Sequence, residues 1–512
     1  MRQALFRLFP STLVLALILS CSGGGGGAGS GGTGGGVTTG TGGKGGSGSG
    51  GAGSGGSGSG GVAAGTGGKA GTGGANADGG GNDAADAAGA DTGGMGGASG
   101  GGMGQMFGSH KFQYPAGTIR PTGTAAALDA AVAAFYDKWK QRYVITDCGG
   151  RYILTGGGTG AIPGTVTVSE GQGYGMGIVP FMAGHDPNAQ MVYDDLYRFF
   201  RRFGSINDPD LMAWSVQQGC QVPNGNGDLA DSATDGDLDI AFSLVLADRQ
   251  WGSNGTINYL GEAKKVITAI KTHEINPITN IVMMGDWADI KAPYYATRYA
   301  NTDGPYGGGQ PFMNFYYGTR PSDFMIDHFR AYASASGDTT WMAVVDAHHA
   351  LVKKMQDSAA PNTGLLPDFI ENVNTNPVPT GPNYLESEAD GRVGYNSCRV
   401  PWHLATDYIA SGDARAKAEV DKINRWIKAK TGSNPGEIRD GYGLDGSTAG
   451  ASKVFAFEAP FGVAAIVDAA NQAWLDAIWR DMVTNTPNTV SYYDDSIKLL
   501  SIIVMSGNWF AP

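Results

Sequence analysis

Hydrophobic residues recur every three to four positions along most of the chain after residue 107, which is the spacing of one face of an α-helix. Few segments alternate hydrophobic and polar residues as strands do. About twelve helices joined by long loops, such as 276–321 and 361–401, favour an all-α barrel or toroid over a simple bundle. We predict helices over 128–143, 170–182, 191–203, 240–251, 259–270, 324–332, 341–355, 402–409, 420–427, 454–469, 474–482 and 493–504.

The first 104 residues follow a different pattern. Residues 1–21 place two arginines before an apolar run that ends at Cys21, as in a secretory signal peptide, and the run is too short to span a bilayer. A small residue followed by cysteine resembles a bacterial lipobox, so we expect a lipid at Cys21 and an anchor in the cell envelope. An ordinary cleaved signal peptide with secretion is the alternative. Residues 22–104, rich in glycine, serine and alanine, are predicted to be a disordered linker, which leaves 105–512 as the folded domain.

Composition and motifs narrow the class of function. The chain has 512 residues with 47 acidic and 35 basic side chains, a net charge of −12, which argues against nucleic-acid binding because that requires a basic footprint. The glycine runs lack a P-loop lysine, and neither HExxH nor a zinc spacing of cysteines occurs, so we expect no cofactor and no metal. In an exported protein two of Cys148, Cys220 and Cys398 could form a disulfide, and the sequence leaves the pairing open.

Two acidic segments are candidates for chemistry. Glu170 lies in VTVSEGQGYGM, where apolar and aromatic neighbours would keep its carboxyl protonated, as a general acid requires. The surrounding glycines would let a ligand approach the backbone closely. Alternatively, Glu170 only caps the helix that follows it. A second cluster lies where the helix 240–251 is predicted to begin; we expect a structural role at the helix N-terminus for most of its members and contact with a sugar for one. Its members are Asp231, Asp235, Asp237 and Asp239.

The segments VSEGQGYGM and ATDGDLDIAFSLVLADRQW together resemble the two signature segments of glycoside hydrolase family 8. The segments LMAWSV, GDWA, TRPSDFMIDHFRAY and YNSCRVPW extend the resemblance over essentially the whole predicted domain. The resemblance implies an (α/α)6 barrel and an endo-acting hydrolase that cleaves β-1,4-linked polysaccharides with inversion of the anomeric configuration. The family includes cellulases, chitosanases, lichenases and xylanases.

The resemblance also implies catalytic roles. Glu170 matches the family's proton donor, and Asp235 matches the residue that positions the sugar at the cleavage subsite. Inversion needs a base about 6.5–9.5 Å from the acid. The cellulase-like branch has an aspartate where this chain has Asn396, so the chain instead resembles the branch of chitosanases and glucanases, which takes its base from the loop just upstream. We predict Glu386 as that base because NYLE resembles the pattern of this branch, with Glu388 as the second choice and Asp390 as a further carboxylate of the same loop.

Substrate contacts are expected from aromatic platforms and fixed polar groups, because sugar rings present apolar faces and hydroxyl edges. The candidates are Tyr174, Trp214, Trp287, Tyr395, Asn396 and Arg399. These features predict a hydrolase of chitosan or β-glucan, with a xylanase or cellulase of the same family as the alternative. A glycan-binding lipoprotein without turnover is the alternative of another class, because the amide of Asn396 cannot accept a proton from water.

Overall fold

The computed structural model describes residues 104–156, 164–222, 230–291, 315–484 and 491–512. The predicted signal peptide 1–21 with Cys21, and all of the predicted linker 22–104 except its last residue, lie outside these ranges. Twelve α-helices occur in the described residues, which confirms the helical class predicted from the hydrophobic spacing. Within the same ranges, no helix combines the length and hydropathy that a bilayer crossing needs.

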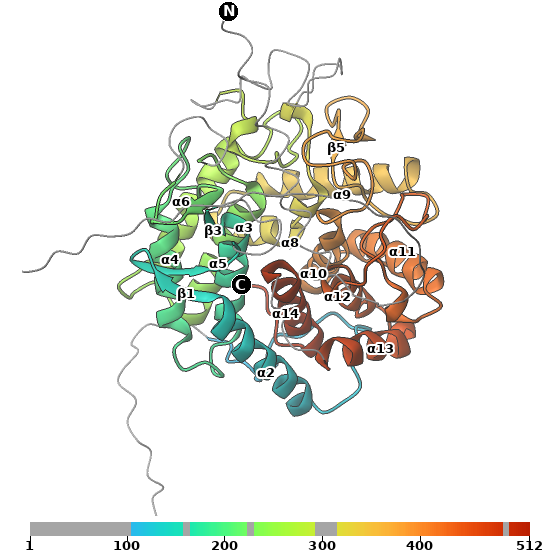
Figure 1. Ribbon diagram of the computed structural model, residues 1–512, viewed down its shortest axis with the longest axis horizontal. Helices are drawn as coiled ribbons and strands as arrows, with labels where there is room; N and C mark the ends of the chain where they lie inside the picture. The colour runs from blue at the N-terminus through green and yellow to red at the C-terminus, as the bar shows by residue number, and fades with distance from the viewer. Residues whose placement is uncertain (1–103, 157–163, 223–229, 292–314, 485–490) are drawn as a thin grey trace, which may run out of the picture. The chain divides into compact units, whose positions relative to one another are not determined.

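The helices form two concentric rings (Figure 1). The inner ring is a closed circle of contacts in which the last helix packs against the first; its members are α3 (Ser169–Phe181), α5 (Thr234–Trp251), α8 (Ile326–Ser336), α10 (Val400–Ser411), α12 (Phe455–Ala465) and α14 (Tyr492–Ser506). The outer helices pack against α14, α3, α5, α8, α10 and α12 in turn; they are α2 (Ala125–Tyr143), α4 (Ala189–Arg202), α6 (Tyr259–His273), α9 (Trp341–Ser358), α11 (Ala414–Lys430) and α13 (Gln472–Val483). The chain thus alternates between outer and inner helices, which is an (α/α)6 barrel.

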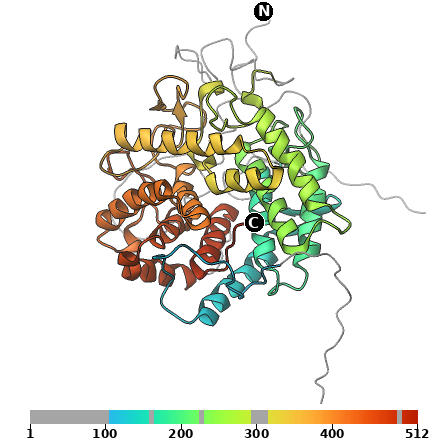
Figure 2. The same ribbon diagram turned by 180° about the vertical axis from the view of Figure 1, so that it is seen from behind.

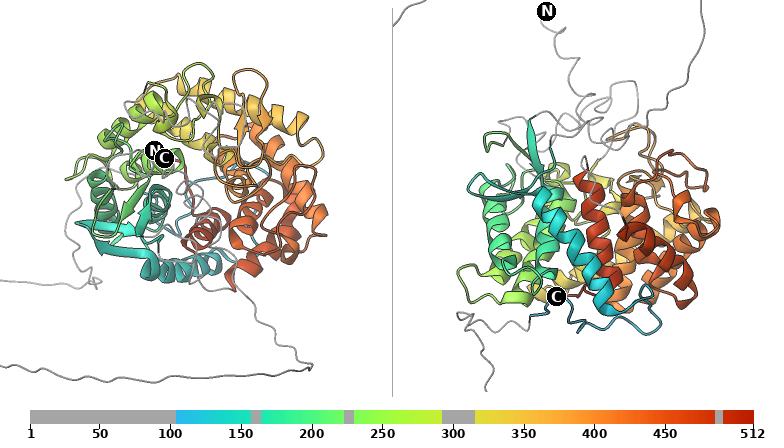
Figure 3. Two further views of the ribbon diagram at one scale, coloured as in Figure 1. Left: turned by 45° about the horizontal axis from the view of Figure 1, so that its top comes forward. Right: turned by 60° about the horizontal axis from the view of Figure 1, so that its bottom comes forward.

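The barrel closes where the first described helix meets the last. In the views from behind and from the tilted directions, α2, in blue, lies beside α14, in dark red (Figure 2, Figure 3). Burial separates the two rings as well. Helix α14 buries every residue from 494 to 506, whereas α11 buries a single stripe at a spacing of three to four residues. An inner helix must be covered on all sides and an outer helix on one side only.

Short strands occupy some of the connections. The strand β1 (Val144–Asp147) forms a hairpin with β2 (Gly150–Ile153), and β5 (Ile370–Glu371) pairs antiparallel with β6 (Val378–Pro379). The strand β3 (Thr165–Val168) pairs antiparallel with β4 (Ser215–Gln217) and leads directly into α3. The backbone N–H of Ser169 donates to the carbonyl of Trp214 at 2.9 Å, so this pairing fixes the start of α3.

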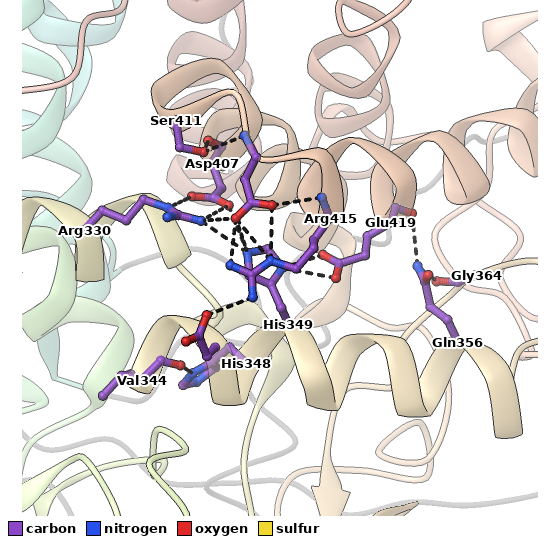
Figure 4. A network of polar contacts seen from close by, with 12 residues as sticks. Arg330, Val344, His348, His349, Gln356, Gly364, Asp407, Ser411, Arg415 and Glu419 are labelled. Carbon is purple, nitrogen blue, oxygen red and sulfur yellow. Dashed lines mark hydrogen bonds and ion pairs between the residues drawn. The ribbon is translucent and has the colours of Figure 1, made fainter. Parts of the chain in front are cut away.

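A buried network of charges joins outer helices to inner ones (Figure 4). Arg330 on α8 donates to Asp407 on α10 at 2.6 Å, and His349 on α9 lies 3.2 Å from Asp407 and 3.0 Å from Glu419 on α11. Burial alone would lower the pKa of His349, but Asp407 and Glu419 raise it to about 9. The ring is therefore a cation at neutral pH, and removing one partner would leave a buried charge uncompensated.

A disulfide joins Cys148, in the turn between β1 and β2, to Cys220, which follows β4. This settles the pairing that the sequence left open, and Cys398 remains a buried free thiol. The two half-cystines are 72 residues apart. The cross-link therefore removes the closure entropy of a long loop from the unfolded chain.

We expect Cys148→Ser to lower the free energy of unfolding by about 4 kcal/mol, the loop-entropy value for a cross-link of this span. Denaturant unfolding of the oxidised protein measures the difference. A reducing agent should lower the stability of the wild type and leave that of Cys148→Ser unchanged. Equal stability of the wild type and the variant under oxidising conditions would contradict the expectation.

Candidate active site

Polar side chains, three of them predicted from the sequence to be functional, gather where the N-terminal ends of the inner helices meet. Glu170 is the second residue of α3, and Asp235 is the second residue of α5. Arg399 immediately precedes α10, Arg320 lies just before α8, and Tyr492 is the first residue of α14. Five of the six inner helices therefore contribute to one constellation, and the positive ends of their dipoles favour acidic side chains there.

Two glycines bring the acidic residues together. A Cβ on Gly173 would lie 2.7 Å from Cβ of Asp239, and a Cβ on Gly236 would lie 2.5 Å from the carbonyl carbon of Ser169. Helices α3 and α5 thus approach through a reciprocal glycine contact just beyond Glu170 and Asp235. Gly173 therefore serves helix packing, whereas the sequence suggested that the glycines around Glu170 admit a ligand to the backbone.

Arg399 is the centre of the site. Its Nη1 donates to Oε2 of Glu170 at 2.9 Å, to Oδ2 of Asp235 at 3.1 Å and to the hydroxyl of Tyr174 at 3.0 Å. Its Nη2 donates to Oδ1 of Asn396 at 3.3 Å. The side chain is 1% exposed, so the guanidinium is held among protein groups and organises the acidic side chains from within.

Glu170 has the environment of an acid that keeps its proton. Burial and the neighbouring charge of Asp235 raise its pKa to about 7, although Arg399 and the hydroxyl of Tyr492 oppose the rise. Tyr492 donates to Oε1 at 2.7 Å. Both oxygens of the carboxyl accept hydrogen bonds from side chains, those of Arg399 and Tyr492, so helix capping alone does not describe Glu170.

Asp235 lies between two arginines. Burial alone would raise its pKa, but Arg320 and Arg399 lower it below the ordinary value. Nη2 of Arg320 lies 3.3 Å from Oδ1, and Arg399 holds Oδ2. Asp235 therefore stays ionised at a pH where the neighbouring Glu170 is half protonated.

The loop upstream of Asn396 presents three carboxylates in different environments. Glu386 is partly buried and accepts a hydrogen bond from Nδ2 of Asn396 at 2.7 Å, and Nη1 of Arg320 lies 3.5 Å from its other oxygen. Burial raises its pKa to about 7. Glu388 is exposed. The carboxylate of Asp390 accepts the backbone N–H groups of residues 385, 386 and 387, so it holds the loop that carries Glu386.

The predicted aromatic platforms are half-buried, unlike the core aromatics. Trp214, Trp287 and Tyr395 are each partly exposed. Tyr395 donates from its hydroxyl to Asp440 at 3.1 Å and packs edge-on against Phe457. Tyr174 differs, because it is 1% exposed and serves as a partner of Arg399. Its position fits support of the site better than contact with a sugar.

A family model described as "Glycosyl hydrolases family 8" matches residues 114–507, which is most of the chain. This chain belongs to glycosyl hydrolase family 8. It is therefore a glycosidase, and the resemblance drawn from the signature segments is confirmed at the level of the family.

Proteins similar to this chain include glucanases. A beta-glucanase of Niallia circulans is 42% identical over 398 residues, which cover 78% of this chain and 89% of that protein. An endoglucanase of Bacillus sp. (strain KSM-330) is 38% identical over 407 residues, covering 78% and 80%. The apo structure of a beta-1,3-1,4-glucanase from Paenibacillus sp. X4 matches with a TM-score of 0.71 and 39% identity, over 80% of this chain and 99% of that one.

A more distant structure shares the fold alone. Rex8A from Paenibacillus barcinonensis, complexed with xylose, matches with a TM-score of 0.60 at 16% identity, over 78% of this chain and all of that chain. The two chains thus share the barrel although their sequences differ widely.

Two residues of the family 8 site were not predicted to have a role. Arg320 belongs to the quoted segment TRPSDFMIDHFRAY, and Tyr492 directly precedes the predicted helix 493–504. Hydrophobic spacing locates the helices but does not say which helix ends meet. A search for polar residues at helix N-termini within the family-like segments would have found Arg320.

Two groups of side chains in the described residues have potential metal-ligand atoms close together, and neither lies at the family 8 site. In the first, Cys148 and Cys220 are joined in the disulfide. In the second, which contains His349, Asp407 and Asp413, Nη2 of Arg330 lies 2.8 Å from Asp413 and 3.4 Å from the histidine. The guanidinium therefore already supplies the positive charge there.

A cluster of buried carboxyls includes Asp237, which follows Asp235 on α5. Asp286 accepts the backbone N–H of Ser232 at 2.9 Å, and Glu274 accepts the Ser232 hydroxyl at 2.6 Å. Asp231 and Asp237 complete this acidic cluster. In the described part of the chain none of the four carboxyls has a lysine, arginine or histidine at ion-pair distance. Burial therefore raises the pKa of Asp231 and of Glu274 to about 8.

We expect the free energy of unfolding to fall as the pH rises from the ordinary carboxyl pKa to about 8, because the carboxyls ionise in the unfolded chain over this range while the buried ones keep their protons. A carboxyl with a folded pKa of about 8 and an ordinary unfolded pKa loses about 1.4 kcal/mol of stability between pH 7 and pH 9. Glu274→Gln should remove that part of the fall.

Thermal unfolding from pH 5 to pH 9 measures the difference, with Glu388→Gln as the exposed control of the same substitution. The expectation fails if the wild type and Glu274→Gln lose stability equally between pH 7 and pH 9.

Proposed function

We propose that this protein is an endo-acting glucanase that cleaves β-1,4 bonds of a β-glucan with inversion of the anomeric configuration. The observation that carries the proposal is the pair of partly buried carboxyls, Glu170 and Glu386, each with a pKa of about 7. They lie at the same end of the barrel and are linked through Arg399 and Asn396.

In this proposal Glu170 is the general acid and Glu386 the general base. Glu386 takes a proton from a water molecule as the water oxygen attacks the anomeric carbon. Glu170 gives its proton to the glycosidic oxygen as the bond from that carbon breaks. The two carboxyls then exchange protons with solvent to restore the starting state.

The environments of the two carboxyls set the direction of the pH dependence. Glu170 must be protonated, so activity falls as the pH rises through its pKa. Glu386 must be ionised, so activity falls as the pH drops through its pKa. Since both values are about 7, the productive form is most populated near neutral pH.

Asp235 has a separate role in the proposal. Its lowered pKa keeps it ionised throughout this range, because the two arginines that flank it stabilise the negative charge. A carboxylate of this kind can accept hydrogen bonds from sugar hydroxyls and stabilise positive charge that develops on the ring. The half-buried Trp214, Trp287 and Tyr395 would supply the apolar platforms.

A β-glucan is the preferred substrate because two glucanases and a beta-1,3-1,4-glucanase structure share 38–42% identity with the chain over most of its length. Chitosan, which the sequence also favoured, is less favoured because the similar proteins named above are glucanases. A xylan is less favoured, since the matching structure bound to xylose is only 16% identical. A binding protein without turnover is also less favoured, because the loop upstream of Asn396 supplies a carboxylate with a raised pKa.

We also propose that the protein is exported and lipid-anchored through Cys21. The support comes from the sequence of residues 1–21 alone, with secretion after ordinary cleavage as the alternative. Mass spectrometry of the protein extracted from cell envelopes would detect the lipid on the N-terminal peptide.

The proposed substrate is tested by reducing-end release from barley β-glucan, carboxymethyl cellulose, chitosan and xylan. We expect release from barley β-glucan to exceed that from the other polymers, and Glu170→Gln to lower it by at least about a thousandfold. Faster release from chitosan would transfer the assignment to that polymer, and release from none of the four would favour the binding-protein alternative.

The proposed base is tested by comparing Glu386→Gln with Glu388→Gln, which lies in the same loop and is exposed. The first substitution should lower kcat on β-glucan by about a hundredfold or more, because general base catalysis contributes that much. The second should leave kcat within about twofold. Binding of oligosaccharides should persist in both variants. A fully active Glu386→Gln would remove Glu386 from this role.

A further inference from the structure

Asn396 connects the two sides of the active site. Its Nδ2 donates to Oε2 of Glu386 at 2.7 Å, and its Oδ1 accepts from Nη2 of Arg399 at 3.3 Å. The other terminal nitrogen of Arg399 holds Glu170. The side chain is buried, with 8% exposed. A continuous chain of hydrogen bonds therefore runs from Glu170 through Arg399 and Asn396 to Glu386.

The chemistry of the partners fixes the orientation of the amide. An ionised carboxylate only accepts hydrogen bonds, so the NH2 group of Asn396 must face Glu386. A guanidinium only donates, so the amide oxygen must face Arg399. Asparagine is the only uncharged side chain of this length that ends in both an NH2 donor and a carbonyl acceptor.

The charges around Glu386 make this amide important. Arg320 provides the nearby positive charge, but it also pairs with Asp235 and with Asp323. Asp390 and Asp368 add negative charge to the surroundings of Glu386. The short hydrogen bond from Asn396 is therefore the closest stabilising contact of the ionised carboxylate and adds no charge of its own.

We propose that Asn396 is a positioning residue whose neutral amide orients Glu386, favours its ionised form and ties it to Arg399. This inference rests on the proposed role of Glu386 as the base. It changes the interpretation of Asn396 from a substrate contact, as the sequence suggests, to a group that acts through the base. A carboxylate at this position would meet the carboxylate of Glu386 at hydrogen-bond distance with no donor between them.

The test is Asn396→Asp, which keeps the size and shape of the side chain and can still pair with Arg399. The new negative charge beside Glu386 should raise the pKa of Glu386. The acidic limb of the pH profile of kcat on β-glucan should therefore move to higher pH by about one pH unit or more. At pH 6 kcat should fall at least about tenfold, while KM stays within about twofold.

Asn396→Ala is the matched variant, because it removes the same donor without adding charge. Its acidic limb should also move to higher pH, but by less than that of Asn396→Asp. An acidic limb that stays in place in both variants would overturn the proposal. A rise in KM with an unchanged kcat profile would overturn it too, since that is the behaviour of a substrate contact.

The activity of Glu386→Gln separates this proposal from the role of Glu386. If Glu386→Gln keeps the activity of the wild type, the base assignment fails whatever Asn396 does. If Glu386→Gln is inactive and the Asn396 variants keep their acidic limbs, the base stands and the positioning role fails. If circular dichroism shows that Asn396→Asp does not fold, the position of the acidic limb in the pH profile of kcat for Asn396→Ala tests the proposal alone.

Discussion

The arrangement of the active site depends on the buried guanidinium of Arg399. It contacts Glu170, Asp235, Tyr174 and Asn396 with only 1% of its side chain exposed. Two carboxylates this close together would repel each other in a low-dielectric interior, and the desolvation of each would cost several kcal/mol. Arg399, with Arg320 on the far side of Asp235, makes their convergence possible. Asp235 pairs with both arginines and stays ionised, whereas Glu170 pairs with Arg399 alone and holds a proton.

The barrel creates this convergence by bringing the N-terminal ends of successive inner helices together. Each inner helix presents a backbone end with free N–H groups and a partial positive charge, so acidic side chains are favoured there before any arginine is counted. The contact between Gly173 and Gly236 then sets how closely α3 and α5 approach. A side chain at either glycine would separate the helices that carry Glu170 and Asp235. The packing of α3 against α5 therefore also sets the spacing of Glu170 and Asp235.

Much of the architecture could be predicted from the sequence because each inner and outer helix has its own hydrophobic pattern. The helix predicted over 240–251 begins earlier, at Thr234, since its first turns are polar and carry acidic residues that hydrophobic spacing does not detect. The roles of Arg320 and Tyr492 could not be predicted in this way, because they depend on contacts between segments far apart in the chain. The pairing of Cys148 with Cys220 has the same cause. It requires the β1–β2 turn and the segment after β4 to lie side by side.

The loop that carries Glu386 shows where sequence and structure must be combined. The sequence narrows the base to three carboxylates, which do not differ in spacing or composition enough to separate them. Their surroundings differ in kind. Asp390 is committed to backbone N–H groups, Glu388 faces solvent, and Glu386 alone of the three has both Asn396 and Arg320 beside it. The amide at position 396 and the carboxylate at position 386 are thus complementary, because the first donates the hydrogen bond that the second accepts. In the proposed mechanism, the departure from the cellulase-like pattern at Asn396 accompanies a base at Glu386 and is not a loss of activity.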